Sequence, residues 1–100
     1  MSDDRIAPDD ADRARMYEQV RLGIDIENLV GSRIGNYLLD RMKEERDTAL
    51  EGLAGVDPHD PRAIRDFQFR IRVVDAIEGW LQDAVTEARN AEQTLRDLDG

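Results

Sequence analysis

One long segment with helical spacing, from Asp60 to Leu98, constrains the fold of this chain more than any other feature. It has no proline after Pro61, and its apolar residues recur at steps of three and four, which is typical of a helix with one buried stripe. They are Ile64, Phe67, Ile71, Val74, Leu81, Val85, Ala88 and Leu95. At about 1.5 Å per residue the helix would be about 57 Å long. A compact domain of 100 residues does not need that length, so we expect the helix to require partners all along it.

Glutamates interrupt the apolar stripe of this segment at positions 78 and 92. Glu78 and Glu92 could be buried acids, or they could reach arginines such as Arg41 or fix the register between helices. The second explanation is the commoner one, because a buried charge is costly unless it is paired.

Two shorter helical patterns precede the long one. The first runs from Ala11 to about Val30, is weakened by Gly23, and ends or bends at Gly31-Ser32. The second runs from Arg33 to about Ala54, with Ser32 as its N-cap and Gly55 as its stop. Its expected buried side consists of Ile34, Leu38, Met42, Ala49 and Leu53.

The loop before the long helix carries the clearest local signals in the chain. A residue before proline is disfavoured in the helical region, so Asp60 is predicted as the N-cap of the long helix and Pro61 as its first residue. A short loop makes the flanking helices antiparallel neighbours. The register that follows pairs Leu53 with Ile64, Ile34 with Leu81, and Val20 with Leu95.

These patterns predict an all-α protein, folded as a long antiparallel helical hairpin whose first arm is bent or broken near Gly31. Residues 1–12 are acidic and have little to bury, so we expect a flexible tail before a single helical domain at 13–98. Gly31 and Gly35 lie one turn apart. They could admit a second helix close to the backbone, or they could simply break the helix.

The long helix has a second apolar line, rotated from the first. Its members include Phe69, Val73, Ala76, Ile77, Trp80, Ala84 and Ala91. A two-helix hairpin buries one stripe per helix, so we expect Phe69, Val73, Ile77, Trp80 and Ala84 to bind a partner, with the indole of Trp80 touching both hairpin and partner. We therefore expect a homo-oligomeric helix bundle. The alternative is a first arm that wraps over this line and closes a three-helix monomer.

Composition excludes several functions. The chain has 14 basic and 23 acidic residues and a net charge of −9, which disfavours direct binding of nucleic acid. It has no cysteine, hence no disulfide, thiolate zinc site or cysteine nucleophile. It has no apolar run of eighteen residues that could cross a membrane.

No catalytic, cofactor or metal site is predicted. The single histidine, His59, stands in a loop and brings too few neighbouring ligands for a metal. No hydroxyl side chain has a histidine base plausibly placed beside it, and the segment Gly31–Gly35 lacks the lysine of a phosphate-binding loop. We expect a protein that is not an enzyme.

The order of several short motifs resembles a known group of proteins. These motifs are Gly35-Asn-Tyr-Leu, Val56-Asp-Pro-His-Asp60-Pro and Trp80-Leu81, within a likeness that covers about residues 32–85. They resemble small helical proteins encoded among the structural and packaging genes of tailed bacteriophages and prophages. The chain differs from that group at Met42 and Phe67, where alanine and leucine are usual. The resemblance implies a virion or assembly component and assigns no activity to any residue.

The sequence therefore leads to two hypotheses for the function of this protein. The first is a non-enzymatic phage-type virion or assembly protein that self-associates through its helices and docks on a larger viral structural protein, in the cytoplasm of a bacterial host or in the virion. The second is an acidic inhibitor or nucleic-acid mimic that blocks a basic site on a host enzyme. The mimic would present carboxylates in place of phosphates, from Glu44, Glu45, Glu51 and Asp57.

Overall fold

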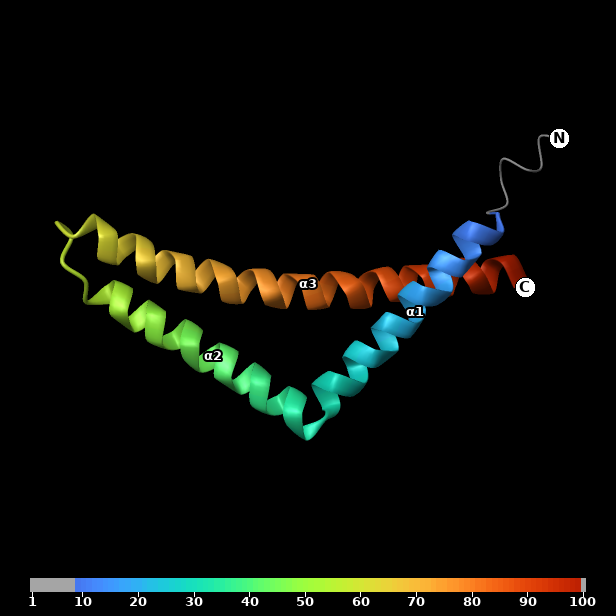
Figure 1. Ribbon diagram of the computed structural model, residues 1–100, viewed down its shortest axis with the longest axis horizontal. Coiled ribbons are helices and arrows are strands. Elements are labelled where there is room, and N and C mark those ends of the chain that lie inside the picture. Colours follow the sequence, from blue (N-terminus) through green and yellow to red (C-terminus); the bar gives the residue numbers. More distant parts are fainter. Residues whose placement is uncertain (1–8, 100) are drawn as a thin grey trace. The chain divides into compact units, whose positions relative to one another are not determined.

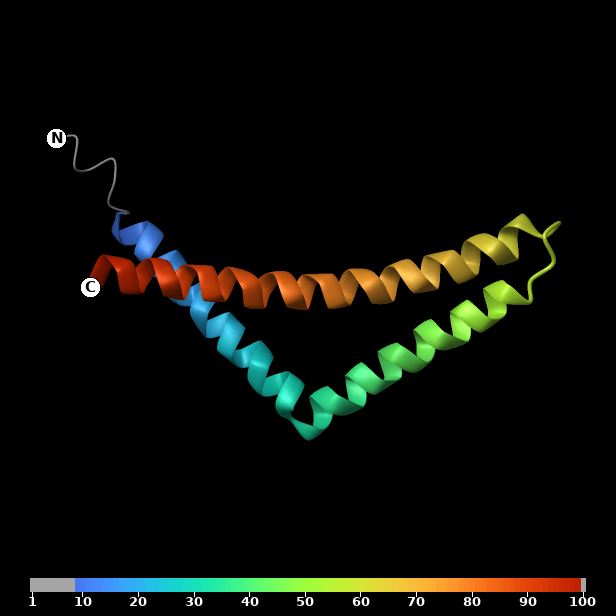
Figure 2. The same ribbon diagram turned by 180° about the vertical axis from the view of Figure 1, so that it is seen from behind.

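The computed structural model describes residues 9–99, and three α-helices account for nearly all of them (Figures 1 and 2). Helix α1 spans Asp10–Gly31, α2 spans Arg33–Ala54 and α3 spans Pro61–Asp99. The prediction of an all-α protein is confirmed. Each helix begins and ends within one residue of its predicted limits.

Helix α1 begins at a capping aspartate. The Asp12 backbone N–H donates to Asp9 Oδ1 at 2.8 Å, and Asp10 and Asp12 lie in the first turn, where the helix dipole favours negative charge. The tail was expected to extend to residue 12, but its last three residues are helical because Asp9 supplies this cap. Residues 1–8 of the expected tail lie outside the described part of the chain.

The break between α1 and α2 falls at Ser32. This residue is extended, with φ −85° and ψ 163°, and its Oγ accepts a hydrogen bond from the Gly35 backbone N–H at 3.0 Å. The same hydroxyl donates to the carbonyl oxygen of Leu29. One serine hydroxyl thus supplies a hydrogen-bond partner to a carbonyl oxygen at the end of α1 and to a backbone N–H at the beginning of α2.

The two glycines beside this break have different roles. A Cβ placed on Gly31 would meet no heavy atom within 4 Å, whereas one placed on Gly35 would lie 1.6 Å from the carbonyl oxygen of Leu29. Neither glycine has a positive φ. Gly35 is therefore needed because the last turn of α1 occupies the space of its side chain.

The loop from Gly55 to Asp60 ends in a second cap. Asp60 Oδ1 accepts from the Ala63 backbone N–H at 3.1 Å, and Pro61 is the first residue of α3. Earlier in the loop, Asp57 Oδ1 accepts from the His59 backbone N–H at 2.9 Å. The two aspartates thus fix successive parts of the turn, but only Asp60 satisfies a free N–H of the helix.

Replacing Asp60 should therefore cost more than replacing Asp57. We expect Asp60→Ala to lower the free energy of unfolding by about 0.5–2 kcal/mol, the usual loss for an N-cap. Asp57→Ala should cost clearly less, because its bond spans only an exposed turn. Denaturant titration followed by circular dichroism measures both variants. Equal losses would mean that α3 is not held by this cap.

The chain forms two compact units. The first contains α1 up to Asn28 together with α3 from Leu81 onward, and the second contains residues Leu29–Trp80. In the first unit, a Cβ on Gly23 would lie 2.2 Å from the Cβ of Ala88, so small residues allow the two helices to approach closely. Its buried apolar residues are Ile26, Ala88, Ala91 and Leu95.

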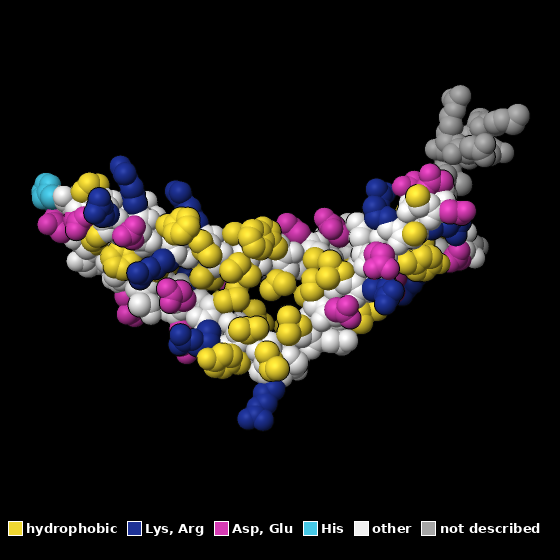
Figure 3. Space-filling view, viewed as in Figure 1, with side chains coloured by type: hydrophobic (Ala, Val, Ile, Leu, Met, Phe, Trp, Pro, Cys, Tyr) yellow, Lys and Arg dark blue, Asp and Glu magenta, His cyan; other side chains and the backbone are white. Residues whose placement is uncertain are grey.

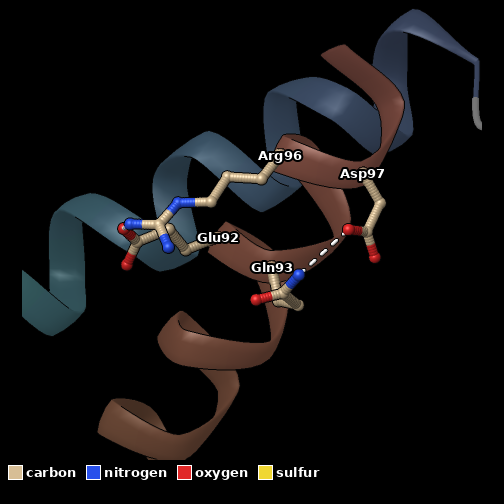
Figure 4. A network of polar contacts seen from close by, with 4 residues as sticks. All are labelled: Glu92, Gln93, Arg96 and Asp97. Atoms are coloured by element: carbon tan, nitrogen blue, oxygen red, sulfur yellow. Dashed lines mark hydrogen bonds and ion pairs between the residues drawn. The ribbon is translucent and has the colours of Figure 1, made fainter. Parts of the chain in front are cut away.

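Ion pairs in the first unit lie at its surface. Arg13 meets Asp99 at 3.7 Å and Arg89 meets Glu27 at 4.0 Å, in both cases between α1 and α3. The last turns of α3 carry an ion pair within the helix, Arg96 with Glu92, and a hydrogen bond that Gln93 donates to Asp97 (Figure 4). Exposed pairs of this kind contribute about 0–1 kcal/mol each, so packing rather than charge holds this unit together.

In the second unit, α2 packs along the beginning of α3. A Cβ on Gly52 would lie 2.3 Å from the Phe67 ring, Ala49 has no exposed surface and Val74 is buried. Arg46 Nε donates to Asp75 Oδ1 at 2.8 Å across the two helices. This hydrogen bond and the charge of Asp75 raise the pKa of Arg46 above its ordinary value, with Glu78 adding to the effect.

The predicted buried side of α2 is wrong at its beginning. Ile34 is 69% exposed and Leu38 is also exposed. The residues with least exposure instead follow steps of four and three: Gly35, Leu39, Met42, Arg46, Ala49 and Leu53. Arg46 belongs to this line of low exposure. Because the line includes a glycine and an arginine, the spacing of apolar residues alone does not reveal it.

The predicted register is wrong by about one helical turn in each unit. It placed Leu53 beside Ile64, whereas Gly52 packs on Phe67, four residues further along α3 than expected. In the first unit the error has the opposite sign, since Gly23 meets Ala88 rather than a residue near position 92. A single register for both pairs requires a continuous first arm, and the extended residue Ser32 interrupts it.

The two glutamates that interrupt the apolar stripe of α3 are not buried. No charged residue between positions 9 and 99 is buried. Glu92 pairs with Arg96 on its own helix, and the charge of Glu78 acts on Arg46. The arginine explanation therefore holds, although Arg41 is not the partner, because it pairs with Glu44 instead.

Candidate interaction surface

The residues predicted to bind a partner differ in exposure. Phe69 is 66% exposed, Trp80 is 68% exposed and Val73 is also exposed. Ile77 and Ala84 are half-buried, and the carbonyl oxygen of Ala84 lies at the contact with Gly23 of α1. Trp80 was expected to touch its own helical partner as well, but most of its surface is open to solvent.

Sequence reasoning missed a second group of exposed apolar residues, on α2. Ile34, Tyr37 and Leu38 are 69%, 63% and 47% exposed. Their spacing of three and one places them on one side of the helix, next to the buried line. Ile34 and Leu38 were predicted to be buried, because apolar residues at helical spacing usually are, and Tyr37 was assigned to neither surface.

Both groups belong to the second unit, and Figure 3 shows hydrophobic side chains exposed along its helices. An aromatic side chain offers roughly 150–250 Å². With about two thirds of each ring exposed, Tyr37, Phe69 and Trp80 leave roughly 400 Å² of aromatic surface in water. The largest apolar patch on a typical monomer is about 300–600 Å² in total. The area of these three side chains is therefore comparable with the largest apolar patch of a typical monomer, and such patches often bind partners.

A shallow depression of about 200 Å³ lies beside this exposed surface. Its lining is mostly apolar and consists of Phe69, Val73, Val74, Glu45 and Arg70. The Arg70 guanidinium lies 5.7 Å from the centre of the Phe67 ring, a cation–π distance. Among residues 9–99, neither Glu45 nor Arg70 forms an ion pair. An apolar floor thus lies between an unpaired acid and an unpaired base.

The negative charge of the protein is unevenly distributed. Residues 29–80 contain ten acidic and eight basic residues, a net charge of −2. Residues 1–28 and 81–100 contain thirteen acidic and six basic residues, a net charge of −7. The three most exposed aromatic side chains among residues 9–99, Tyr37, Phe69 and Trp80, therefore lie in the part of the chain where two copies would repel each other least, whereas Tyr17, 50% exposed, lies in the acidic part.

This charge distribution disfavours a nucleic-acid mimic that presents Glu44, Glu45, Glu51 and Asp57 in place of phosphates. Glu44, Glu45, Glu51 and Asp57 are all exposed, but they belong to the nearly neutral unit. Glu44 is also paired with Arg41 at 3.1 Å. A surface that competes for a polyphosphate site needs a concentrated negative field, and these four carboxylates are interspersed with arginines.

Two other kinds of feature, a metal-binding cluster and a membrane-spanning helix, are absent from residues 9–99. Between positions 9 and 99, no three acidic, histidine or cysteine side chains gather closely enough to hold a metal ion. His59 is exposed in its loop. No helix within the same range is both long and apolar enough to cross a membrane.

Comparisons with known proteins add no relative. The chain matches no protein-family model, no curated protein and no solved structure. The exposed surface and the resemblance of the sequence motifs therefore remain the features that bear on function.

Proposed function

We propose that this chain is a non-enzymatic assembly protein that self-associates through its helices and docks on a larger protein. The observation that carries the proposal is the exposure of Phe69, Trp80 and Tyr37 in the nearly neutral unit. Large aromatic side chains are costly to leave in water and are the residues that most often anchor protein–protein interfaces. In this proposal the hairpin, with its first arm broken near Gly31, is the building block of an oligomeric helix bundle.

The assembly proposed is of the tailed-phage type. It is supported by the resemblance of residues 32–85 to small helical proteins encoded among phage structural and packaging genes. The larger partner is then a viral structural protein, met in the cytoplasm of the bacterial host or in the virion. Portal and terminase genes beside the gene for this chain would support the proposal, and a neighbourhood without any phage gene would remove its viral part.

Self-association is tested on the intact chain. We expect sedimentation equilibrium between about 5 and 300 µM to give masses that rise above the 11.4 kDa of one chain. Because an apolar contact is little screened by salt, raising sodium chloride from 50 to 500 mM should change the dissociation constant only slightly. A mass of 11.4 kDa at every concentration would refute self-association.

A salt series of binding to a basic host protein separates this function from that of an acidic inhibitor. A mimic binds its basic target through charge, so its affinity should fall steeply as salt is added. A monomer that binds a basic host protein only at low salt would favour the inhibitor over the assembly protein.

A further inference from the structure

We propose that the partner of the exposed surface on α3 is a second copy of this chain, paired antiparallel about a two-fold axis close to residues 74 and 75. Trp80 of each copy then packs on Phe69 and Val73 of the other. This inference rests on the proposed self-association and goes beyond it by naming the residues and their orientation.

The spacing of the exposed stripe supports helix pairing. Phe69, Val73, Ala76 and Trp80 follow steps of four, three and four, which is the spacing of a seam between two helices. The core residue Val74 lies one position away from Val73 and faces α2, so α3 can bind α2 and a second copy at once. The stripe is short, and it ends at the charged residues Asp66 and Asp83.

An antiparallel arrangement makes this stripe self-complementary. A two-fold axis at its centre places Phe69 opposite Trp80 of the second copy and Val73 opposite Ala76 of the second copy. Each interface position then serves both copies, as an isologous contact requires. In a parallel arrangement each residue would face its own counterpart. The large Trp80 would then meet Trp80, and the smaller Val73 and Ala76 would meet their own counterparts, which fills the space between the helices less evenly.

The depression beside Phe69 fits the incoming indole. Its floor is apolar, from Phe69, Val73 and Val74, and the Glu45 carboxylate at its edge has no ion-pair partner in the described chain. A buried indole N–H usually finds an acceptor, and Glu45 can supply one. Aromatic pairing of Trp80 with the opposite Phe69 adds to the burial.

Charge favours the same orientation. Along the line of the stripe, arginines occur before it, at Arg62 and Arg65, and acids occur after it, at Asp83 and Glu87. Antiparallel copies bring the arginines of one chain toward the acids of the other, although Asp66 and Asp83 also approach. Parallel copies would place like charges together at both ends.

The two rings form a small contact, which predicts weak association. Two rings about two thirds exposed bury roughly 260 Å² per copy, well below the roughly 800 Å² per partner of a standard interface. We therefore expect a dissociation constant in the micromolar range. Such a contact suits assembly on a larger partner, where many weak contacts add together.

Replacing Trp80 tests the anchor. Truncation of a hot-spot tryptophan should weaken dimerisation by about 30-fold or more, so at about 10 µM Trp80→Ala should sediment as a monomer where the unchanged chain is partly dimeric. Tyr17→Ala is the matched control, because Tyr17 is an aromatic residue that is 50% exposed but lies on α1, in the other unit. It should change the dissociation constant less than about threefold. Circular dichroism verifies that both variants remain helical.

Spin labels test the orientation. The chain has no cysteine, so single cysteines can be introduced at Asp66 and, separately, at Arg72. In an antiparallel pair the two labels at position 66 are separated by about 25 Å along the helix axis, and those at position 72 by about 8 Å. A parallel pair would give short distances at both positions.

The outcomes separate this inference from the proposed function. A monomeric protein would overturn both. A dimer with two short label distances, or a dimer weakened by Tyr17→Ala as much as by Trp80→Ala, would overturn the antiparallel α3 contact and leave self-association standing. A Trp80-dependent dimer with a long distance at position 66 and a short one at 72 is the result expected.

Discussion

Gly35→Ala is expected to be the most destabilising single-methyl change in this protein. Alanine normally favours a helix over glycine by about 1 kcal/mol. At this position, however, the added Cβ would lie 1.6 Å from the carbonyl oxygen of Leu29, and a backbone atom cannot move aside by changing rotamer. Relief requires the last turn of α1 to shift and the Ser32 cap to be disturbed. We expect a net loss of about 3 kcal/mol in the free energy of unfolding.

Gly79→Ala is the matched control for this prediction. Gly79 also lies in a helix, its φ is not positive, and a Cβ there would meet no heavy atom within 4 Å. It should stabilise the protein by about 0.5–1 kcal/mol. Both variants are measured by denaturant titration at one fixed protein concentration, since association would shift apparent stability. If Gly35→Ala also stabilised the protein, the junction between α1 and α2 would not be closely packed.

Gly23→Ala is expected to have the second largest effect. Its Cβ would lie 2.2 Å from the Cβ of Ala88, which is rigidly attached to α3, so the two helices must separate. Overpacking of this kind typically costs about 1–3 kcal/mol, which exceeds the gain in helix propensity.

A compensating substitution isolates the cause. In the double variant Gly23→Ala with Ala88→Gly, the methyl group moves from one helix to the other and the contact keeps its volume. We expect the double variant to recover most of the lost stability, with a coupling of about 1 kcal/mol or more between the two positions. Additive losses would mean that the cost of Gly23→Ala arises within α1 and not from its contact with α3.

The charge distribution connects these packing sites to the proposed function. The close helix contact at Gly23 lies in the strongly acidic unit, and Phe69 and Trp80 lie in the nearly neutral one. Two copies that meet through Phe69 and Trp80 thus avoid opposing their acidic segments directly. The acidic segments remain available to keep a weakly associating protein in solution.

The sequence by itself determined the secondary structure. Ser32, Asp60 and Pro61 act within three or four residues of themselves, through side-chain hydrogen bonds and restricted backbone angles, so their effects can be read without knowing what packs against them. The exposed line through Phe69, Val73 and Trp80 was also predicted. A helix pair covers only one stripe of α3, and the residues outside that stripe are known once its period is known.

Only the tertiary structure decided which residues of α2 are buried, how far each helix is shifted along α3, and what the glycines do. Ile34 and Leu38 have the composition of core residues but are exposed, while Arg46 takes a place in the seam through its bond to Asp75. Gly23 was predicted only to weaken its helix, and for Gly35 a close approach and a plain break both stayed open, whereas in the structure a neighbouring atom occupies the side-chain space of each glycine. Register and close approach depend on the fit between surfaces distant along the chain, and the hydrophobic period is the same for every register.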